Sequence, residues 1–349
     1  MNICFLEGDM SRRGGTERMT ALLANALCKT EDIWVISKRM DGDTVFFEMD
    51  NCVRHSVLFT SKSCIPKQII EIRKFIRCNK IDWVINVDIG MAIYGIPACC
   101  GTKAKVITWE HANYYNNWNS RVFPYFRRFA AKHSDAMVVL TNRDKENYCT
   151  NFTTKVPIYV IPNPAQRQNY CYDSESKIIL SAGLLLPIKG YDKAIQAAAQ
   201  ILPKYPDWKW IICGEGSERM HLEELIVQNG LQKQMFLIGT VNNIEEQYRN
   251  AAMFVMTSEM EGLPMVLLEA KSWGLPLVSF DIMTGPSDII RDDVNGYLLK
   301  ANDVQALADS IEKLIQSKER RILFSDNAIL DMDRFDFDEI MGEWRKILQ

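Results

Sequence analysis

Two glutamates in the second half of the chain, Glu261 and Glu269, lie eight positions apart on either side of a helix start. Apolar segments that fit buried strands flank them at 253–256 and 276–280. Pro264 fits the first helical position, where its missing N–H leaves no hydrogen bond unmade. The order strand, loop, helix, strand predicts a parallel sheet covered by helices. It also predicts an anion site at the helix amides, on the carboxyl edge of that sheet.

The residues between the two carboxylates carry more information than their spacing, which by itself also fits two solvated helix-end glutamates. Residues 261–270 read Glu-Gly-Leu-Pro-Met-Val-Leu-Leu-Glu-Ala and resemble the carboxylate motif of the retaining family 4 glycosyltransferases. The resemblance implies an α/β protein with the GT-B fold, in which two Rossmann-like domains face each other across a cleft and a C-terminal helix crosses back to the first domain. It also implies a nucleotide-sugar donor with its sugar at Glu261, its ribose at Glu269 and its diphosphate at the turn of Gly262, Leu263 and Pro264.

A second segment supports the same resemblance. Residues 183–192 read Gly-Leu-Leu-Leu-Pro-Ile-Lys-Gly-Tyr-Asp and are similar to a family segment in which an arginine and a lysine meet the donor diphosphate. Lys189 occupies the lysine position, between a predicted strand and a predicted helix, where a cation stabilises the leaving group. Leu184 departs from the pattern, because the family usually has arginine there. Either Lys189 and the helix amides suffice, another basic residue substitutes, or catalysis is weak.

Two further strand ends match the family's nucleotide site. Gly214 lies in a Gly-x-Gly turn after the strand predicted at 208–213, where glycine lets the backbone approach a nucleotide. A turn of this composition also occurs without a ligand. Val241 follows the strand predicted at 235–238, and the resemblance implies backbone contacts from Val241 to the base.

In the first half, Gly14 and Gly15 join the first predicted strand to the first helix. Paired glycines at a helix N-terminus favour a phosphate-approach loop, and the resemblance assigns them to the donor. A plain turn capped by Thr16 is the alternative. The loop lacks the Gly-x-Gly-x-x-Gly pattern, which argues against a nicotinamide enzyme.

His111 follows the strand predicted at 106–109. A lone histidine is more often structural than catalytic. The resemblance, however, implies a cleft histidine here that contacts the donor sugar and supports the transition state. Glu110 and Asn113 are weaker candidates for the acceptor site, and Glu110 is also a candidate for orienting His111.

Short apolar strands alternate with helical patterns along the whole chain, which predicts parallel sheets in two domains. Pro162 and Pro164 forbid a helix after the strand at 156–161, and we place the boundary there. The prediction is an acceptor-binding domain over 1–165, joined by a C-terminal helix at 335–349, and a donor-binding domain over 166–334. Other expected strands lie at 3–6, 33–37, 82–87, 136–140 and 178–182.

Charge divides at the same boundary. Residues 1–165 hold 22 Lys and Arg against 16 Asp and Glu, and residues 166–349 hold 19 against 28, so the halves carry +6 and −9. The basic half is expected to face an anionic acceptor or an anionic membrane surface, and the basic, aromatic stretch at 119–133 is a candidate for that contact. A helix with buried aromatics and solvated arginines is the alternative. The net charge of −3 and the absence of a nucleic-acid module in the sequence argue against nucleic acid.

The start of the chain runs directly into a strand-like segment and shows no signal-peptide pattern. The apolar stretch at 84–100 is interrupted by Asp88, Pro97 and several glycines, which argues against a membrane span. The ten cysteines have no repeated pair spacing. We expect reduced, mostly buried thiols in a cytoplasmic protein, with neither a zinc site nor a disulfide framework.

These patterns predict a cytoplasmic glycosyltransferase, peripheral at the inner face of the cell membrane, that takes part in surface polysaccharide synthesis. It would move a hexosyl unit from a nucleotide-diphosphate sugar, expected to be a UDP-sugar, to a glycan or lipid-linked saccharide. Retention would follow from front-face attack, with His111, Lys189 and Glu261 as catalytic residues. No cofactor is expected, and no metal, because no Asp-x-Asp pair stands in a metal-binding context. Two alternatives stay open: a nucleotide-sugar epimerase of the same fold, and a non-catalytic donor-binding partner subunit, motivated by Leu184.

Overall fold

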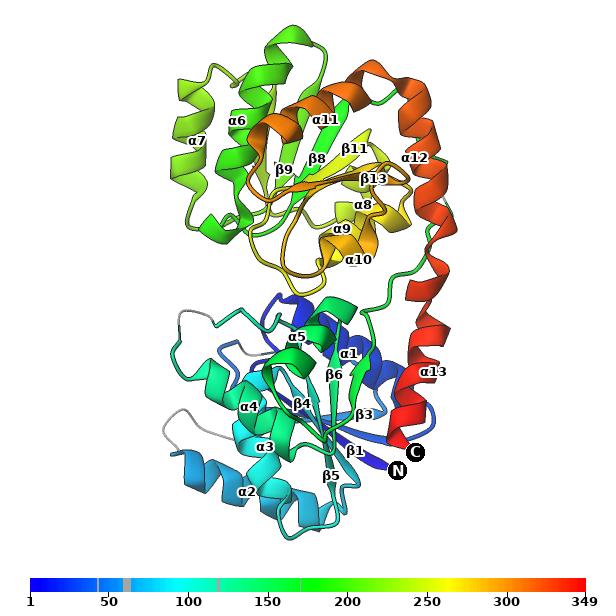
Figure 1. The fold of residues 1–349 in the computed structure, drawn as a ribbon. Helices are drawn as coiled ribbons and strands as arrows, with labels where there is room; N and C mark the ends of the chain where they lie inside the picture. The colour runs from blue at the N-terminus through cyan, green and yellow to red at the C-terminus, as the bar shows by residue number, and fades with distance from the viewer. Residues whose placement is uncertain (43, 59–63, 118–119, 170) are drawn as a thin grey trace. The chain divides into compact units, whose positions relative to one another are not determined.

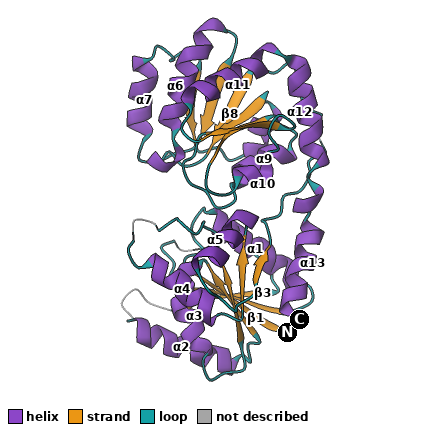
Figure 2. Cartoon of the chain, in the orientation of Figure 1, coloured by secondary structure: helices purple, strands orange, loops and turns teal. Residues whose placement is uncertain are grey.

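The computed structural model describes residues 1–42, 44–58, 64–117, 120–169 and 171–349. The chain divides into two compact units: unit 1 is residues 1–163 with 340–349, and unit 2 is residues 164–339. Each unit is a single parallel sheet with helices on both of its faces (Figures 1 and 2). The predicted fold class, two Rossmann-like α/β domains, is confirmed.

Unit 1 has a seven-stranded sheet in the order β3-β2-β1-β4-β5-β6-β7, with every pair parallel. Its strands are β1 (Asn2–Glu7), β2 (Asp32–Ser37), β3 (Val53–Val57), β4 (Trp83–Val87), β5 (Lys105–Trp109), β6 (Ala136–Val139) and β7 (Ile158–Val160). Its helices are α1 (Gly15–Leu27), α2 (Ile65–Cys78), α3 (Ala92–Cys99), α4 (Phe123–His133), α5 (Asn142–Asn151) and, from Ile340 onward, α13 (Phe337–Leu348).

The C-terminal helix α13 packs into unit 1 through one apolar face. Ile340, Met341, Trp344 and Leu348 recur at helical spacing and are all buried. The Trp344 ring meets Trp109 edge to face, with centroids 4.9 Å apart, and Trp83 Nε1 donates to the Leu348 carbonyl at 2.8 Å. The end of the chain therefore covers β4 and β5, the two strands that lead into the loops of the candidate site.

Unit 2 has a six-stranded parallel sheet in the order β10-β9-β8-β11-β12-β13. Its strands are β8 (Ile178–Ala182), β9 (Lys209–Cys213), β10 (Met235–Gly239), β11 (Met253–Met256), β12 (Leu277–Asp281) and β13 (Gly296–Lys300). Its helices are α6 (Tyr191–Ile201), α7 (Arg219–Gln228), α8 (Ile244–Arg249), α9 (Met265–Ser272), α10 (Pro286–Ile289), α11 (Val304–Gln316) and α12 (Lys318–Leu330).

The unit 2 core explains why its strands read as continuous apolar runs. All four residues of β11 are buried, because helices cover both faces of a parallel sheet. Ile195 of α6, Trp210 of β9 and Leu307 of α11 lie in the same buried cluster. This core holds the carboxyl ends of the strands in one row, and the predicted donor residues follow those ends.

Two cysteine expectations are wrong. Cys28, directly after α1, and Cys52, directly before β3, form a disulfide with Cα atoms 5.8 Å apart. Of the other eight cysteines, only Cys4, Cys99 and Cys213 are buried. The two cysteines are 24 positions apart in the sequence and are brought together by the fold, so no local spacing pattern predicts the disulfide. None of the described helices is both long and apolar enough to cross a membrane.

Candidate active site

Three neighbouring strands of unit 2 are tied together at Gly214. A Cβ at this residue, whose φ is +149°, would lie 1.9 Å from the Gly183 carbonyl oxygen. The Gly214 amide donates to the Gly239 carbonyl at 2.8 Å, which joins the ends of β9 and β10. Only glycine allows this close approach of the loops. Val241 is half-buried and follows β10 at the same edge of the sheet.

The structure brings two predicted catalytic residues into direct contact. Lys189 Nζ lies 2.6 Å from Glu261 Oε1, and both side chains are partly exposed, at 22% and 15%. Thr257 Oγ1 donates to the Lys189 carbonyl at 3.0 Å, and Thr284 Oγ1 donates to the Glu261 carbonyl at 2.6 Å. Hydroxyls at the ends of β11 and β12 therefore fix the backbone of both residues. Sequence reasoning missed the two threonines, whose only signal is their place just after a strand.

Helix α9 begins one residue later than predicted. Pro264 is its N-cap, with φ −72° and ψ 105°, and the first helical residue is Met265. The difference arises because proline restricts its own φ equally well in the flanking position, so the sequence alone does not separate the two. A Cβ at Gly285, where φ is +99°, would lie 2.6 Å from the Gly262 carbonyl oxygen, so the loop after β12 packs directly on this turn.

Glu269 is the fifth residue of α9 and is held by the preceding helix. Tyr248 of α8 donates its hydroxyl to Glu269 Oε2 at 2.9 Å, and the same hydroxyl lies 3.3 Å from the Val266 carbonyl. Glu261 stands before the helix and Glu269 one turn inside it, in the arrangement that the eight-residue spacing predicted. The amides of the first turn lie between them, where an anion is favoured.

Leu184 leaves Lys189 without a neighbouring arginine. The Leu184 side chain is 61% exposed. The basic residues that follow Lys189 and Gly214 in sequence are engaged with carboxylates: Lys193 Nζ lies 2.5 Å from Glu259, and Arg219 Nη1 lies 2.6 Å from Glu215. Lys193 and Arg219 are thus ion-paired in this structure, as Lys189 is with Glu261.

The Gly14–Gly15 loop has its own carboxylate. Gly14 is the N-cap of α1 and makes no side-chain capping bond, and Thr16 is the second helical residue. A Cβ at Gly14 would lie 2.1 Å from Glu17 Oε2, so the Glu17 side chain folds back over the glycine. Burial raises the pKa of Glu17, against hydrogen bonding to its own amide. Capping by Thr16 is wrong, because Thr16 is the second residue of α1, and the space beside Gly14 holds the Glu17 carboxyl group.

His111 carries an unpaired ring nitrogen. Its Nε2 is buried and makes no hydrogen bond to any described residue, while its ring lies 4.1 Å from that of Trp109. Burial lowers the pKa of His111 to about 3, so the imidazole is neutral at pH 7. A buried, unpaired nitrogen on a half-buried residue is a feature that a ligand can satisfy.

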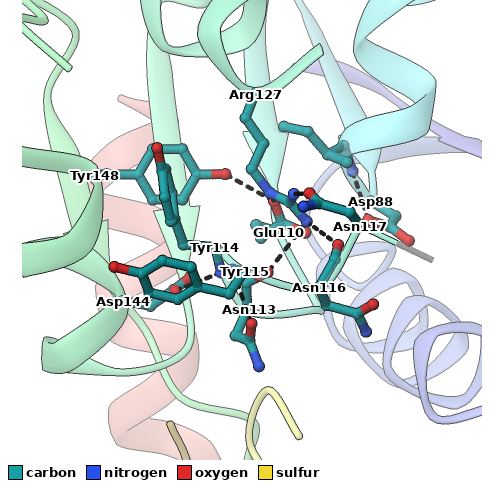
Figure 3. A network of polar contacts seen from close by, with 11 residues as sticks. Asp88, Glu110, Asn113, Tyr114, Tyr115, Asn116, Asn117, Arg127, Asp144 and Tyr148 are labelled. Carbon is teal, nitrogen blue, oxygen red and sulfur yellow. Dashed lines mark hydrogen bonds and ion pairs between the residues drawn. The ribbon is translucent and has the colours of Figure 1, made fainter. Parts of the chain in front are cut away.

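Glu110 lies inside the unit rather than on its surface (Figure 3). Its Oε2 accepts from Arg127 Nε at 3.2 Å and from the Tyr148 hydroxyl at 2.7 Å. Asn113 is also buried, and its Oδ1 accepts from the Tyr115 amide at 2.9 Å. Both residues therefore shape the loop that carries His111, and neither is on the surface for an acceptor to touch.

Among the Lys and Arg residues of the stretch at 119–133, Arg127 is the buried one. Arg127 is 1% exposed, whereas Arg121, Arg128 and Lys132 are exposed. Phe123, Phe126 and Phe129 pack against the buried core of unit 1, so the alternative of a helix with buried aromatics is right for these rings. Residue 119 lies outside the described residues.

Metal ligands do not gather around the predicted catalytic residues. In the described ranges, one group of three potential ligands was found, Cys28, Asp50 and Cys52 in unit 1. Two of its members are the disulfide pair.

The likeness of this chain to known families covers both units. The family described as "Glycosyl transferases group 1" matches residues 163–331, and "Glycosyltransferase Family 4" matches residues 13–168. The two matches together extend over 13–331. The chain belongs to these family 4 type glycosyltransferases and has the GT-B fold.

Relatives that match over almost their full length are also glycosyltransferases. The chain is 28% identical over 352 residues to an uncharacterized glycosyltransferase of Haemophilus influenzae, covering 99% of both chains. It is 27% identical over 361 residues to a Campylobacter jejuni α-1,4-N-acetyl-D-galactosaminyltransferase that acts on a diphosphoundecaprenol-linked saccharide, covering 100% of this chain and 98% of that one. The solved structure of Anabaena HepE with UDP-glucose has a TM-score of 0.85 at 18% identity, covering 100% and 99% of the two chains, which concerns the fold.

Proposed function

We propose that the protein transfers a hexosyl unit from a UDP-sugar to a lipid-linked or other glycan acceptor, with retention at the anomeric carbon. The observation that carries the proposal is the Lys189–Glu261 contact of 2.6 Å in front of α9. A cation, a sugar-binding carboxylate and free helix amides within one turn are the groups that a nucleotide-diphosphate sugar requires. The Campylobacter relative's name, with its α-1,4 linkage and its undecaprenol-diphosphate-linked acceptor, supports the acceptor class.

Each residue receives a separate role. Lys189 and the first-turn amides of α9 hold the diphosphate and stabilise the charge that grows on it as the glycosidic bond breaks. Glu261 accepts hydrogen bonds from sugar hydroxyls, and Glu269 from the ribose. Donor binding then exchanges the Lys189–Glu261 pair for a Lys189–phosphate pair and frees Glu261 for the sugar. Val241 offers its backbone to the base.

In unit 1, His111 contacts the donor sugar through its unpaired Nε2. A neutral imidazole can either donate or accept a hydrogen bond there, without adding positive charge that would oppose an oxocarbenium-like transition state. The amides at Gly14 and Gly15 approach the donor diphosphate, in competition with the Glu17 carboxylate. Glu110 and Asn113 act through the loop that they shape.

Transfer is proposed to need no metal ion. Lys189 and the amides of α9 supply the positive charge that a divalent cation supplies in other transferases. Transfer should therefore continue unchanged in excess EDTA. Loss of activity that added Mg²⁺ or Mn²⁺ restores would contradict this part of the proposal.

Peripheral binding to the cytoplasmic membrane face is proposed through Arg121, Arg128 and Lys132. These exposed cations lie around Tyr125, which is 73% exposed. Attraction to an anionic surface is worth about 1 kcal/mol per basic residue. Sedimentation with phosphatidylglycerol vesicles should fall as salt rises and when Arg121 and Arg128 are changed to Glu.

The matched control for membrane binding changes Lys103 and Lys155 to Glu. Both residues are exposed on unit 1 and precede strands rather than α4. The control makes the same change in net charge and should retain vesicle binding. Equal loss in both double variants would mean that net charge, and not this segment, attracts the membrane.

A non-catalytic donor-binding subunit is the second candidate, because Leu184 removes one expected cation. The deciding experiment is a thermal-shift panel of UDP-, GDP- and ADP-sugars followed by product analysis. A donor at 100 times its dissociation constant should add about 2.7 kcal/mol of stability. Donor binding with transfer supports the enzyme; donor binding without transfer to any acceptor favours the subunit; conversion of the donor alone to an epimer favours an epimerase.

A further inference from the structure

The loop after β5 is built around the buried guanidinium of Arg127. Arg127 reaches from α4 into the loop (Figure 3), where Nη1 donates to Asn117 Oδ1 at 2.7 Å. Nη2 donates to the carbonyls of Asn113 at 3.1 Å and Asn116 at 2.5 Å. Of its four hydrogen bonds to described residues, three therefore hold groups of one short loop. A lysine has no planar fork and cannot satisfy all of these acceptors in the same geometry.

Glu110 fixes Arg127 from the other side. The Nε–Oε2 distance is 3.2 Å, and the pair is fully buried. Burial raises the pKa of Glu110 against the opposing charge of Arg127, and it also raises the pKa of Asp88, which faces Glu110. Tyr148 and Asp144 complete the surroundings, since the Tyr114 amide donates to Asp144 Oδ1 at 2.7 Å. The cluster is thus anchored to α4 and α5 and to Asp88, the residue that follows β4.

The loop presents an aromatic ring and several amides at its surface. Tyr115 is 39% exposed and meets Tyr114 edge to face at 5.0 Å. Asn116 and Asn117 are half-buried, and His111 stands at the start of the loop. This arrangement suits a saccharide. The exposed ring can stack on the C–H face of a pyranose, and the amide groups beside it can bond the hydroxyls of the sugar.

We propose that Arg127 is a positioning residue that holds residues 113–117 in the shape of an acceptor-saccharide subsite, with Tyr115 as its stacking platform. The inference rests on the proposed function and names the acceptor half of that site. Arg127 itself touches no substrate. It acts on the acceptor indirectly, because its hydrogen bonds fix the carbonyls of Asn113 and Asn116 and the side-chain amide of Asn117.

The test compares Arg127→Lys with Arg73→Lys. Arg73 is a matched control in unit 1, because its guanidinium also donates to two backbone carbonyls, Ala98 at 3.2 Å and Pro97 at 2.5 Å, but far along the chain from the loop. The assay uses the p-nitrophenyl or lipid-diphosphate hexoside that the wild type uses fastest, with donor affinity measured by calorimetry. Arg127→Lys should raise the acceptor KM by about tenfold or more and leave the donor Kd within about twofold. Arg73→Lys should change neither.

Tyr115 supplies a second test that does not disturb the buried cluster. Tyr115→Ala should raise the acceptor KM as Arg127→Lys does, and Tyr115→Phe should preserve it. A lowered Tm with an unchanged acceptor KM in Arg127→Lys would make Arg127 merely structural and overturn the inference. If Arg127→Lys does not fold, an unchanged KM in Tyr115→Ala overturns it. A wild type that neither binds nor transfers any nucleotide sugar would contradict the proposed function and the inference together.

Discussion

Replacing Glu7 with Gln should remove a pH dependence of stability from unit 1. Glu7 is the last residue of β1, which lies between β2 and β4 in the sheet, and it is 4% exposed. Burial raises its pKa from 4.5 to about 8; hydrogen bonds from the Gly8 amide and the Thr20 hydroxyl oppose the rise, and the nearby Glu17 and Asp88 carboxylates add to it. The folded protein therefore holds a proton on Glu7 at pH values where the unfolded chain has lost it.

The direction in which stability changes with pH follows from that proton. Because the folded pKa is raised, the contribution of Glu7 is fully present below pH 4.5 and is lost as the pH rises toward 8. Each unit of pKa difference corresponds to about 1.4 kcal/mol, so the loss between pH 5 and pH 8 is about 3 kcal/mol. Glutamine has nearly the same shape and stays neutral, so Glu7→Gln should lose none of this. Its stability advantage over the wild type should grow steadily with pH.

Hydrogen exchange of the β1 amides measures this in the intact chain, because β1 is paired on both sides, to β2 and β4. Exchange free energies of wild type and Glu7→Gln at pH 5 and pH 8 give the difference directly, and a carboxyl NMR titration gives the pKa of Glu7 itself. Glu48→Gln, an exposed carboxylate of the same unit, is the control. Parallel stability curves for wild type and Glu7→Gln would refute the reasoning.

Three further outcomes are expected at the donor site. Lys189→Ala should lower kcat by about 10²-fold or more, because it removes a charge that acts mainly in the transition state. An unchanged kcat would show that Lys189 does not act on the diphosphate. Glu269→Ala should weaken UDP binding in calorimetry, by about tenfold for one lost pair of charge-assisted hydrogen bonds, and Glu312→Ala, on α11, should not. Leu184→Arg should raise transfer, because a second cation joins Lys189; a loss of transfer would show that Leu184 does more than leave a cation out.

The sheets were predictable because a parallel sheet buries both of its faces. The segment at 253–256 coincides with β11, an uninterrupted apolar run, and 178–182 coincides with β8, which is apolar except for Ser181. β3 was missed because Val53–Val57 is an edge strand that contains Arg54 and His55 and reads as polar. β13 was also missed: Gly296–Lys300 is apolar only over its three central residues, between a glycine and a lysine.

The sequence predicts the residues of the donor site better than it predicts the structure of the loop at 111–117. Lys189 and Glu261 each stand in a short motif, and their meeting follows from two parallel strands ending at the same edge. Arg127 has no such motif: its partner Glu110 is 17 positions away and belongs to another element, so periodicity describes Arg127 as one more basic residue of an amphipathic helix. Only three-dimensional packing separates the buried Arg127 from the exposed Arg128 next to it.

The absence of arginine at position 184 has a physical consequence once Lys189 and Glu261 are known to touch. A paired lysine and glutamate add no net charge, so an approaching diphosphate first meets a neutral pair 2.6 Å across. The remaining attraction comes from the first turn of α9, which is equivalent to roughly half an elementary charge. An arginine would add a full charge before the pair opens. Under the proposed function, donor binding then depends on separating Lys189 from Glu261, and the event that binds the diphosphate would release the carboxylate for the sugar.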